Sequence, residues 1–123
     1  MSATDAPSRP VTDQLDTALM RWAAAQLLPE ESATPPTGEG LEVLALLLRG
    51  QIQAAIPEIE HLSSRVSEDP VTYGAWLQVQ VARRRLAATA GPYEVGLLWL
   101  ARRLARSVIE LADSHDRLME VLS

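Results

Sequence analysis

The 123-residue sequence lacks three residue types, and each absence limits what the protein can be. Because it contains no cysteine, disulfide bonds and thiolate metal sites are both excluded. It contains no phenylalanine, so we expect an aliphatic core in which Trp22, Trp76 and Trp99 are the large side chains. It also contains no lysine, so arginine supplies every basic side chain.

Long apolar runs are missing as well. The longest strongly apolar stretch, residues 41–48, contains Glu42 and ends before Arg49. It is far shorter than the roughly 20 residues that a membrane-spanning helix needs. The first ten residues are polar and lack the apolar stretch of a signal peptide. We therefore expect a cytoplasmic protein with no membrane partner.

The charge is negative overall and unevenly distributed. A net charge of −5 argues against general affinity for nucleic acids. Residues 1–70 carry four arginines and eleven acidic residues, whereas residues 71–106 carry six arginines and only one acidic residue, Glu94. Residues 107–123 are acidic again, with four carboxylates and one arginine. A basic block thus lies between two acidic ones.

Proline and glycine clusters divide the chain into a tail and four segments. Residues 1–10 contain two prolines, and we expect a disordered tail there, followed by a single domain over residues 11–123. Thr12 or Asp13 is a suitable cap for the first helix. Helical periodicity between the clusters predicts helices at about 12–28, 40–67, 71–89 and 93–121.

The second and fourth segments have the clearest pattern, an alternating spacing of four and three residues. In the second segment it covers Leu41, Ala45, Leu48, Ile52, Ala55, Ile59, Leu62 and Val66. In the fourth it covers Leu97, Ala101, Leu104, Val108, Leu111, His115, Leu118 and Leu122. Such seams are typical of packed helices, so we predict an all-α, antiparallel four-helix bundle with long second and fourth helices.

Two features modify the second helix. Gly50 and Pro57 oppose a straight helix, but the seam keeps its phase across both residues, which favours one kinked helix over two separate ones. Further apolar residues surround the seam in the N-terminal half, namely Val43, Leu44, Leu46 and Leu47. We therefore expect that half to be buried on several sides.

The sequence contains no nucleophile elbow, P-loop or dinucleotide fingerprint, so we assign no catalytic residue and no cofactor. Glu58 and His61 have the three-residue spacing of carboxylate-bridged di-iron bundles. That site needs a second such pair, and Ala112 occupies the position that would have to be glutamate before His115. We therefore expect no metal site.

His115 is the polar residue of the fourth seam, and its position predicts that it faces the core. The simpler interpretation is a neutral histidine that is hydrogen-bonded to a neighbouring carbonyl or carboxylate. The alternative is a general base or a ligand contact. Asp113 and Asp116 flank His115 and could orient it, although both are equally ordinary residues of a helix surface.

Six arginines in the third and fourth helices form two clusters, Arg83 to Arg85 and Arg102 with Arg103 and Arg106. In an antiparallel pair both clusters lie near the connecting turn, where they could bind a phosphate, another anionic ligand or an acidic protein. The simpler interpretation is pairing with Glu58, Glu60 and Glu68, and of Arg106 with Glu110. The candidate contacts for a ligand or anion are His115, Arg83, Arg84, Arg102, Arg103, Arg106 and Trp99.

Four segments carry a resemblance to a known family. They are LRGQI at 48–52, IPEIE at 56–60, VARRRL at 81–86 and ARRLAR at 101–106. Over roughly residues 41–120 the chain resembles a family of small actinobacterial all-helical proteins of unknown function that are labelled natural-product biosynthesis proteins. The resemblance implies a cytoplasmic helical protein encoded near secondary-metabolite genes. It brings no catalytic residues.

These observations leave three functions open. The first is a non-catalytic accessory or interaction protein that binds a partner protein or, as a homodimer, itself. The second is a small-molecule-binding protein or enzyme with a cavity near His115 and the arginine face. The third is a DNA-binding regulator that uses the third and fourth helices.

Overall fold

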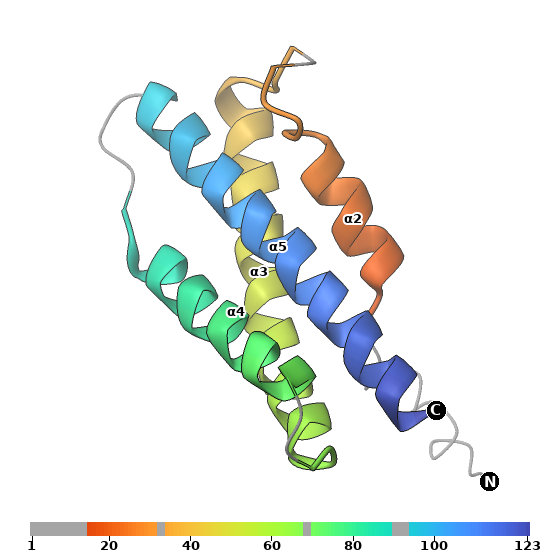
Figure 1. Cartoon of the computed structure of the whole chain (residues 1–123). Coiled ribbons are helices and arrows are strands. Elements are labelled where there is room, and N and C mark those ends of the chain that lie inside the picture. The colour runs from red at the N-terminus through yellow and green to blue at the C-terminus, as the bar shows by residue number, and fades with distance from the viewer. Residues whose placement is uncertain (1–14, 32–33, 68–69, 90–93) are drawn as a thin grey trace, which may run out of the picture.

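The described part of the protein is a bundle of four helices. The computed structural model describes residues 15–31, 34–67, 70–89 and 94–123 (Figure 1). The helices are α2 (Thr17–Ala25), α3 (Gly38–Ser64), α4 (Pro70–Ala87) and α5 (Glu94–Leu122). These ranges contain no strand, and no helix in them is long and apolar enough to cross a membrane. The predicted all-α bundle is confirmed.

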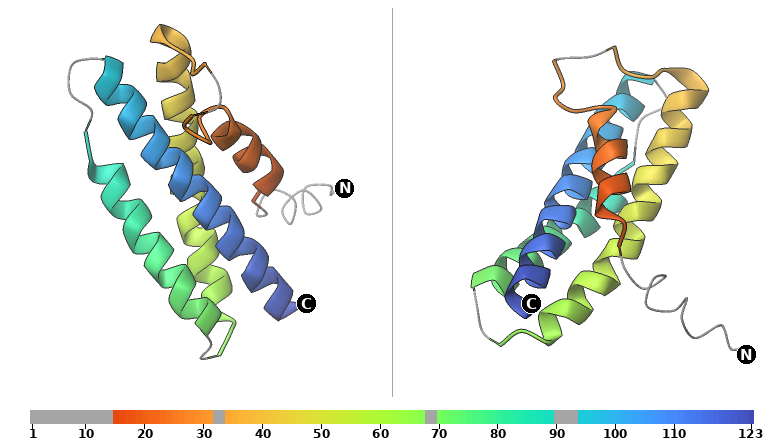
Figure 2. Two further views of the ribbon diagram at one scale, coloured as in Figure 1. Left: turned by 45° about the horizontal axis from the view of Figure 1, so that its top comes forward. Right: turned by 90° about the vertical axis from the view of Figure 1, so that its right-hand side faces the viewer.

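The arrangement centres on the two long helices. Helices that follow one another in the chain run in opposite directions, and α3 and α5 therefore run the same way (Figure 1). The most extensive contact in the bundle is between α3 and α5, and α4 packs chiefly against α5. The short helix α2 lies against α5 and α3 on the other side (Figure 2).

The helix ends differ from the predicted ones by a few residues. The described part of the first helix begins at Thr17 because Asp16 caps it, with the amide nitrogen of Leu19 donating to the carboxylate at 2.9 Å. The predicted caps Thr12 and Asp13, and the predicted tail, lie outside the described residues. Helix α3 begins at Gly38, whose φ of 57° is in the left-handed region that favours glycine.

Helix α3 is a single helix of 27 residues that continues through Gly50 and Pro57, as the unbroken seam predicted. Pro57 cannot donate a hydrogen bond to the carbonyl of Gln53. Gln53 and Pro57 are both exposed, so the side of the helix with the missing hydrogen bond faces solvent. The kink itself remains a prediction.

Both seams form the core of the bundle. On α3, the seam residues from Leu41 to Leu62 are all buried, and Val66 packs at the edge of the core. On α5, the seam is buried from Ala101 to Leu118, and its two terminal leucines are half-buried. Periodicity alone was therefore sufficient to identify the buried faces of the long helices.

The predicted place of the tryptophans is wrong. Trp22, Trp76 and Trp99 are 58%, 55% and 54% exposed. The core is aliphatic, but its larger side chains are mainly leucine, isoleucine and valine, and fully buried alanines lie among them, including Ala55 on α3 and Ala101, Ala105 and Ala112 on α5. Alanines at a helix contact favour a close approach of the two backbones, which leaves little room for an indole ring.

Candidate functional site

The predicted ligand contacts do not form one site. Arg84, Arg103 and Trp99 line a pocket between α4 and α5, whereas His115 lines a different pocket towards the other end of α5. Twelve residues of continuous helix separate Arg103 from His115, which corresponds to roughly 18 Å along the axis. A single cavity shared by His115 and the arginines is not present among the described residues.

The pocket between α4 and α5, which we call the arginine pocket, has a volume of about 340 Å³. It is lined by Val81, Arg84, Arg85, Ala88, Trp99 and Arg103. The antiparallel packing of α4 on α5 brings the end of one arginine cluster next to the start of the other, as expected. Arg85 belongs to this site although the candidate set omitted it.

The three cations of the arginine pocket differ in their partners. Nη1 of Arg85 donates to the hydroxyl of the buried Ser107 at 2.9 Å and to the carboxylate of Glu110 at 3.1 Å. The guanidinium carbon of Arg103 lies 5.0 Å from the centre of the Trp99 ring, in a cation–π contact. Arg84 is exposed and has no ion pair among the described residues. Only Arg85 is therefore neutralised by a carboxylate.

The remaining arginines of the candidate set have structural partners. Arg83 pairs with Glu60 at 2.8 Å, which confirms pairing with the second predicted helix for this residue. Arg106 pairs with the carboxylate of Glu30 instead of the predicted Glu110, because Glu110 is bound by Arg85. Arg102 donates to the backbone carbonyl of Glu30 at 3.1 Å. Together, Arg102 and Arg106 attach the loop that follows α2 to α5.

His115 is buried, as its seam position predicted, with 8% of its surface exposed. Its Nδ1 has no hydrogen-bond partner among the described residues, and the nearest carboxylate oxygen, of Asp116, is 3.7 Å away. The pocket it lines measures about 540 Å³ and also contains Leu15, Glu58, His61, Leu62, Arg65 and Met119. The described residues contain no cluster of histidine and carboxylate side chains suited to a metal ion.

The acidic residues that flank His115 serve another contact. Arg21 of α2 pairs with Asp113 at 2.8 Å and with Asp116 at 2.7 Å. Hydrogen bonds to Asp113 and then Asp116 raise the pKa of Arg21 above its ordinary value. The expected role of the two aspartates in orienting His115 is therefore replaced by a role in holding α2 against α5.

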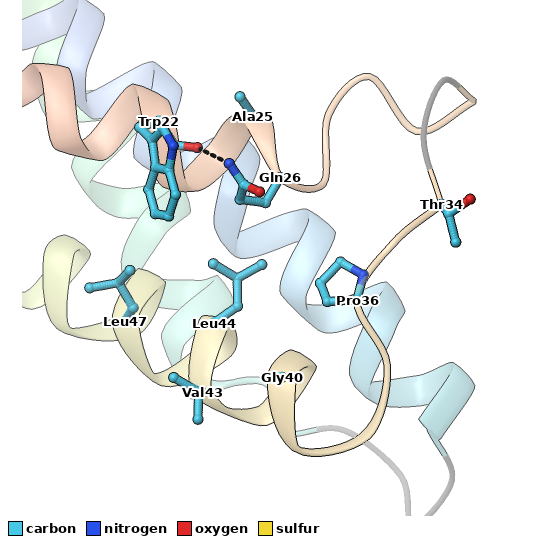
Figure 3. Close-up of a pocket in the computed structure, with 9 residues that line it drawn as sticks. All are labelled: Trp22, Ala25, Gln26, Thr34, Pro36, Gly40, Val43, Leu44 and Leu47. Atoms are coloured by element: carbon cyan, nitrogen blue, oxygen red, sulfur yellow. Dashed lines mark hydrogen bonds between the residues drawn. The ribbon is translucent and has the colours of Figure 1, made fainter.

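A second tryptophan lies in a groove that the sequence did not predict. This apolar groove between α2 and α3 has a volume of about 510 Å³ (Figure 3). It is lined by Trp22, Ala25, Gln26, Thr34, Pro36, Gly40, Val43, Leu44 and Leu47. Figure 3 shows Trp22 on α2 facing Leu44 and Leu47 on α3 across the groove, with Pro36 at one end.

The expected burial of the N-terminal half of α3 on several sides is wrong. Leu44 belongs to the core, but Val43 is 62% exposed and Leu46 is 68% exposed. The sequence does contain a sign of this exposed apolar surface, namely apolar residues at positions outside the seam. These residues predict burial within the bundle, whereas in the structure Val43, Leu44 and Leu47 line the apolar groove and Leu46 is exposed outside its lining.

Exposed glutamates lie in the segments that form the apolar groove, but none of them is part of its lining. They are Glu31 in the loop after α2, and Glu39 and Glu42 on α3. None of the three has an ion pair among the described residues. These segments, which we call the margin of the groove, therefore combine exposed apolar surface with unpaired negative charge.

Comparison with known proteins places this fold in a family. No curated protein and no solved structure matches the sequence. The sequence model of DUF6415, described as a family of unknown function, matches residues 18–120, which include nearly all of the four helices and both tryptophan-containing pockets. The chain therefore belongs to this family of unknown function.

Proposed function

We propose that this protein is a non-catalytic interaction module that binds an amphipathic helix of a partner protein in the apolar groove. One observation carries this proposal: Trp22 on α2 and Val43 on α3, which both line the groove, are more than half exposed. Exposed apolar side chains that gather in one place are typical of binding surfaces. Tryptophan is also among the residues that contribute most to protein interfaces.

The shape of the groove suits a helix. Two antiparallel helices leave a furrow between them, and a third helix can lay its apolar stripe along it with side chains at i, i+3, i+4 and i+7. Trp22 on one wall and Leu47 on the other would contact opposite sides of that stripe. Val43, which also lines the groove, would extend the contact along α3.

The charge of the margin selects the kind of helix. Glu31, Glu39 and Glu42 would attract lysine and arginine residues that flank the apolar stripe of the partner. The proposed partner is therefore a basic amphipathic helix. A second copy of this chain is the alternative occupant, and the experiment below distinguishes the two.

Two designed peptides test the proposal. Both are helical with leucine at i, i+3, i+4 and i+7, and the remaining positions are lysine in one peptide and glutamate in the other. A protein carrying Trp76→Phe and Trp99→Phe retains Trp22 as its single tryptophan, so its fluorescence reports on the groove. We expect the leucine/lysine peptide to shift the Trp22 emission to the blue and to bind at least about tenfold more tightly than the leucine/glutamate peptide.

A matched pair of variants locates the binding. Val43→Ser should weaken binding of the leucine/lysine peptide, whereas Val121→Ser, the same change at an exposed position near the end of α5, should not. Equal binding of the two peptides, or equal behaviour of the two variants, would refute the proposal. A dimer in sedimentation experiments that Val43→Ser dissociates would identify a second copy as the occupant and refute it as well.

The other functions considered from the sequence have less support. An enzyme or binder that uses His115 together with the arginines lacks a shared cavity among the described residues. DNA binding would have to rely on few unpaired cations in a protein of net charge −5. The association with natural-product biosynthesis that the resemblance implies stays a prediction, which inspection of neighbouring genes would test.

A further inference from the structure

The arginine pocket contains positive charge that the described protein does not neutralise. Its lining includes three arginines and no carboxylate. Glu110 compensates Arg85, but neither Arg84 nor Arg103 has an ion pair among the described residues. Two cations of like charge at one pocket repel each other, and an anion bound between them would relieve that repulsion.

The pocket also offers more than charge. The side chain of Arg85 is only 14% exposed. Its contacts with Ser107 and Glu110 hold it in place in the lining. Trp99 is 54% exposed and is positioned by the cation–π contact with Arg103. Val81 and Ala88 supply apolar surface beside it. A bare inorganic anion would leave this aromatic and aliphatic lining unused.

We propose that the arginine pocket binds a small organic oxyanion, with its phosphate or carboxylate group held by Arg84 and Arg103 and its apolar or aromatic part lying against Trp99. Guanidinium groups present planar pairs of donors that match the oxygens of a carboxylate or phosphate. The volume of about 340 Å³ lies within the range of small-molecule sites. The site is independent of the proposed function, because it lies between α4 and α5.

The lining argues against a nucleic acid as the ligand. A polyanion needs a track of basic side chains along its backbone. Here Arg83 is paired with Glu60 and Arg106 with Glu30, and Arg102 donates to the backbone carbonyl of Glu30, so the described cations that are free to bind an anion in this region are those of the pocket. A single oxyanion matches that supply of charge.

Four probes test this site with a protein carrying Trp22→Phe and Trp76→Phe, in which Trp99 is the single tryptophan. They are phenyl phosphate, benzoate, inorganic phosphate and benzyl alcohol, and binding is measured by Trp99 fluorescence and calorimetry. We expect phenyl phosphate or benzoate, or both, to bind at least about tenfold more tightly than inorganic phosphate and benzyl alcohol. The order of the first two then identifies the natural anionic group as a phosphate or a carboxylate.

Two substitutions connect the binding to the proposed residues. Arg84→Gln should weaken the tighter of the two aromatic anions about tenfold, because one charged donor pair is lost. Arg117→Gln, at another exposed arginine of α5, is the matched control and should have no effect. Thermal unfolding followed by circular dichroism verifies that both variants fold.

Several results would overturn the proposal. Inorganic phosphate binding as tightly as phenyl phosphate would indicate an adventitious ion only. Benzyl alcohol binding as tightly as the aromatic anions would indicate an apolar site in which the arginines play no part. Equal effects of Arg84→Gln and Arg117→Gln, or no binding of either aromatic anion at millimolar concentration, would also refute it.

Discussion

The apolar groove and the arginine pocket each contain one exposed tryptophan, but the charges around the two tryptophans are opposite. Trp22 lies among aliphatic side chains with unpaired glutamates at the margin. Trp99 lies among arginines, one of which contacts its ring. The same residue type is therefore placed in surroundings that would select opposite ligands.

The difference follows the distribution of charge along the chain. Residues 1–70, which include α2 and α3, carry most of the acidic residues, and residues 71–106, which include α4 and the start of α5, carry the basic block. Because the apolar groove lies between α2 and α3 and the arginine pocket between α4 and α5, the blocks of the sequence become separate surfaces of the bundle. The uneven distribution of charge along the sequence thus produces two chemically distinct sites.

The largest expected effect is on the free energy of unfolding, and it tests whether both tryptophans lie outside the core. Leu48→Ala removes a fully buried side chain of the α3 seam and should lower the free energy of unfolding by about 3 kcal/mol. Trp22→Ala and Trp99→Ala should each lower it by about 1 kcal/mol or less, because both rings are more than half exposed. Urea unfolding measures all three, and a tryptophan variant as unstable as Leu48→Ala would contradict the comparison.

The next effect separates the two sites by charge. The double variant Arg84→Gln/Arg103→Gln should weaken phenyl phosphate or benzoate, whichever binds more tightly to the unsubstituted pocket, about 100-fold, since two donor groups are lost. The leucine/lysine peptide should bind this variant as it binds the unsubstituted protein. Calorimetry with both probes measures the separation. Loss of peptide binding in the double variant would mean that the two surfaces are coupled.

The reciprocal change has a smaller expected effect. Glu39→Gln/Glu42→Gln removes two exposed carboxylates from the margin of the apolar groove and should weaken the leucine/lysine peptide about fivefold at low salt. The dependence of that affinity on salt should also decrease, because fewer charges attract the peptide. Fluorescence titrations at two salt concentrations measure both. An unchanged affinity and salt dependence would show that the margin does not select the partner.

The smallest expected effect concerns a wall of the groove. Arg21→Gln removes the pairs with Asp113 and Asp116 and should lower the free energy of unfolding by about 1 kcal/mol or less, since all three side chains are well exposed and the attraction is screened. A guanidinium is already charged at neutral pH and the pKa of Arg21 is raised further, so the effect should not vary there. Arg117→Gln is the control, and an equal effect on thermal unfolding would mean that the two pairs contribute nothing.

The sequence predicted the elements of the fold better than the surface. Leu48, Ile52 and Leu104 could be assigned to the core because the spacing of apolar residues is a local property of a helix. The same spacing contains no information on the distance between two helices. The exposure of Trp22 depends on how α2 packs against α5 and α3, so periodicity could not predict it.

The candidate site could be predicted only in part, because local sequence patterns do not show which residues distant in the chain come into contact. Antiparallel packing of α4 and α5 was sufficient to bring Arg84 and Arg103 to one pocket. The partners of Arg102 and Arg106 could not be predicted, because Glu30 is more than 70 residues away in the chain and reaches them only through the packing of α2 on α5. His115 was correctly placed inside, but its distance from the arginines follows from the length of α5 as a continuous helix.

The attachment of α2 has a consequence for how the apolar groove is regulated. Helix α2 has only nine residues, too few to be stable as an isolated helix, and buries Met20, Ala23 and Ala24. Ion pairs connect it to α5 through Arg21, in the middle of the helix, and through Glu30 in the following loop. One wall of the groove is therefore held in part by electrostatic contacts. Rising ionic strength should increase amide hydrogen exchange in α2 before it does so in α3 or α5, which would make the groove the most salt-sensitive part of the bundle.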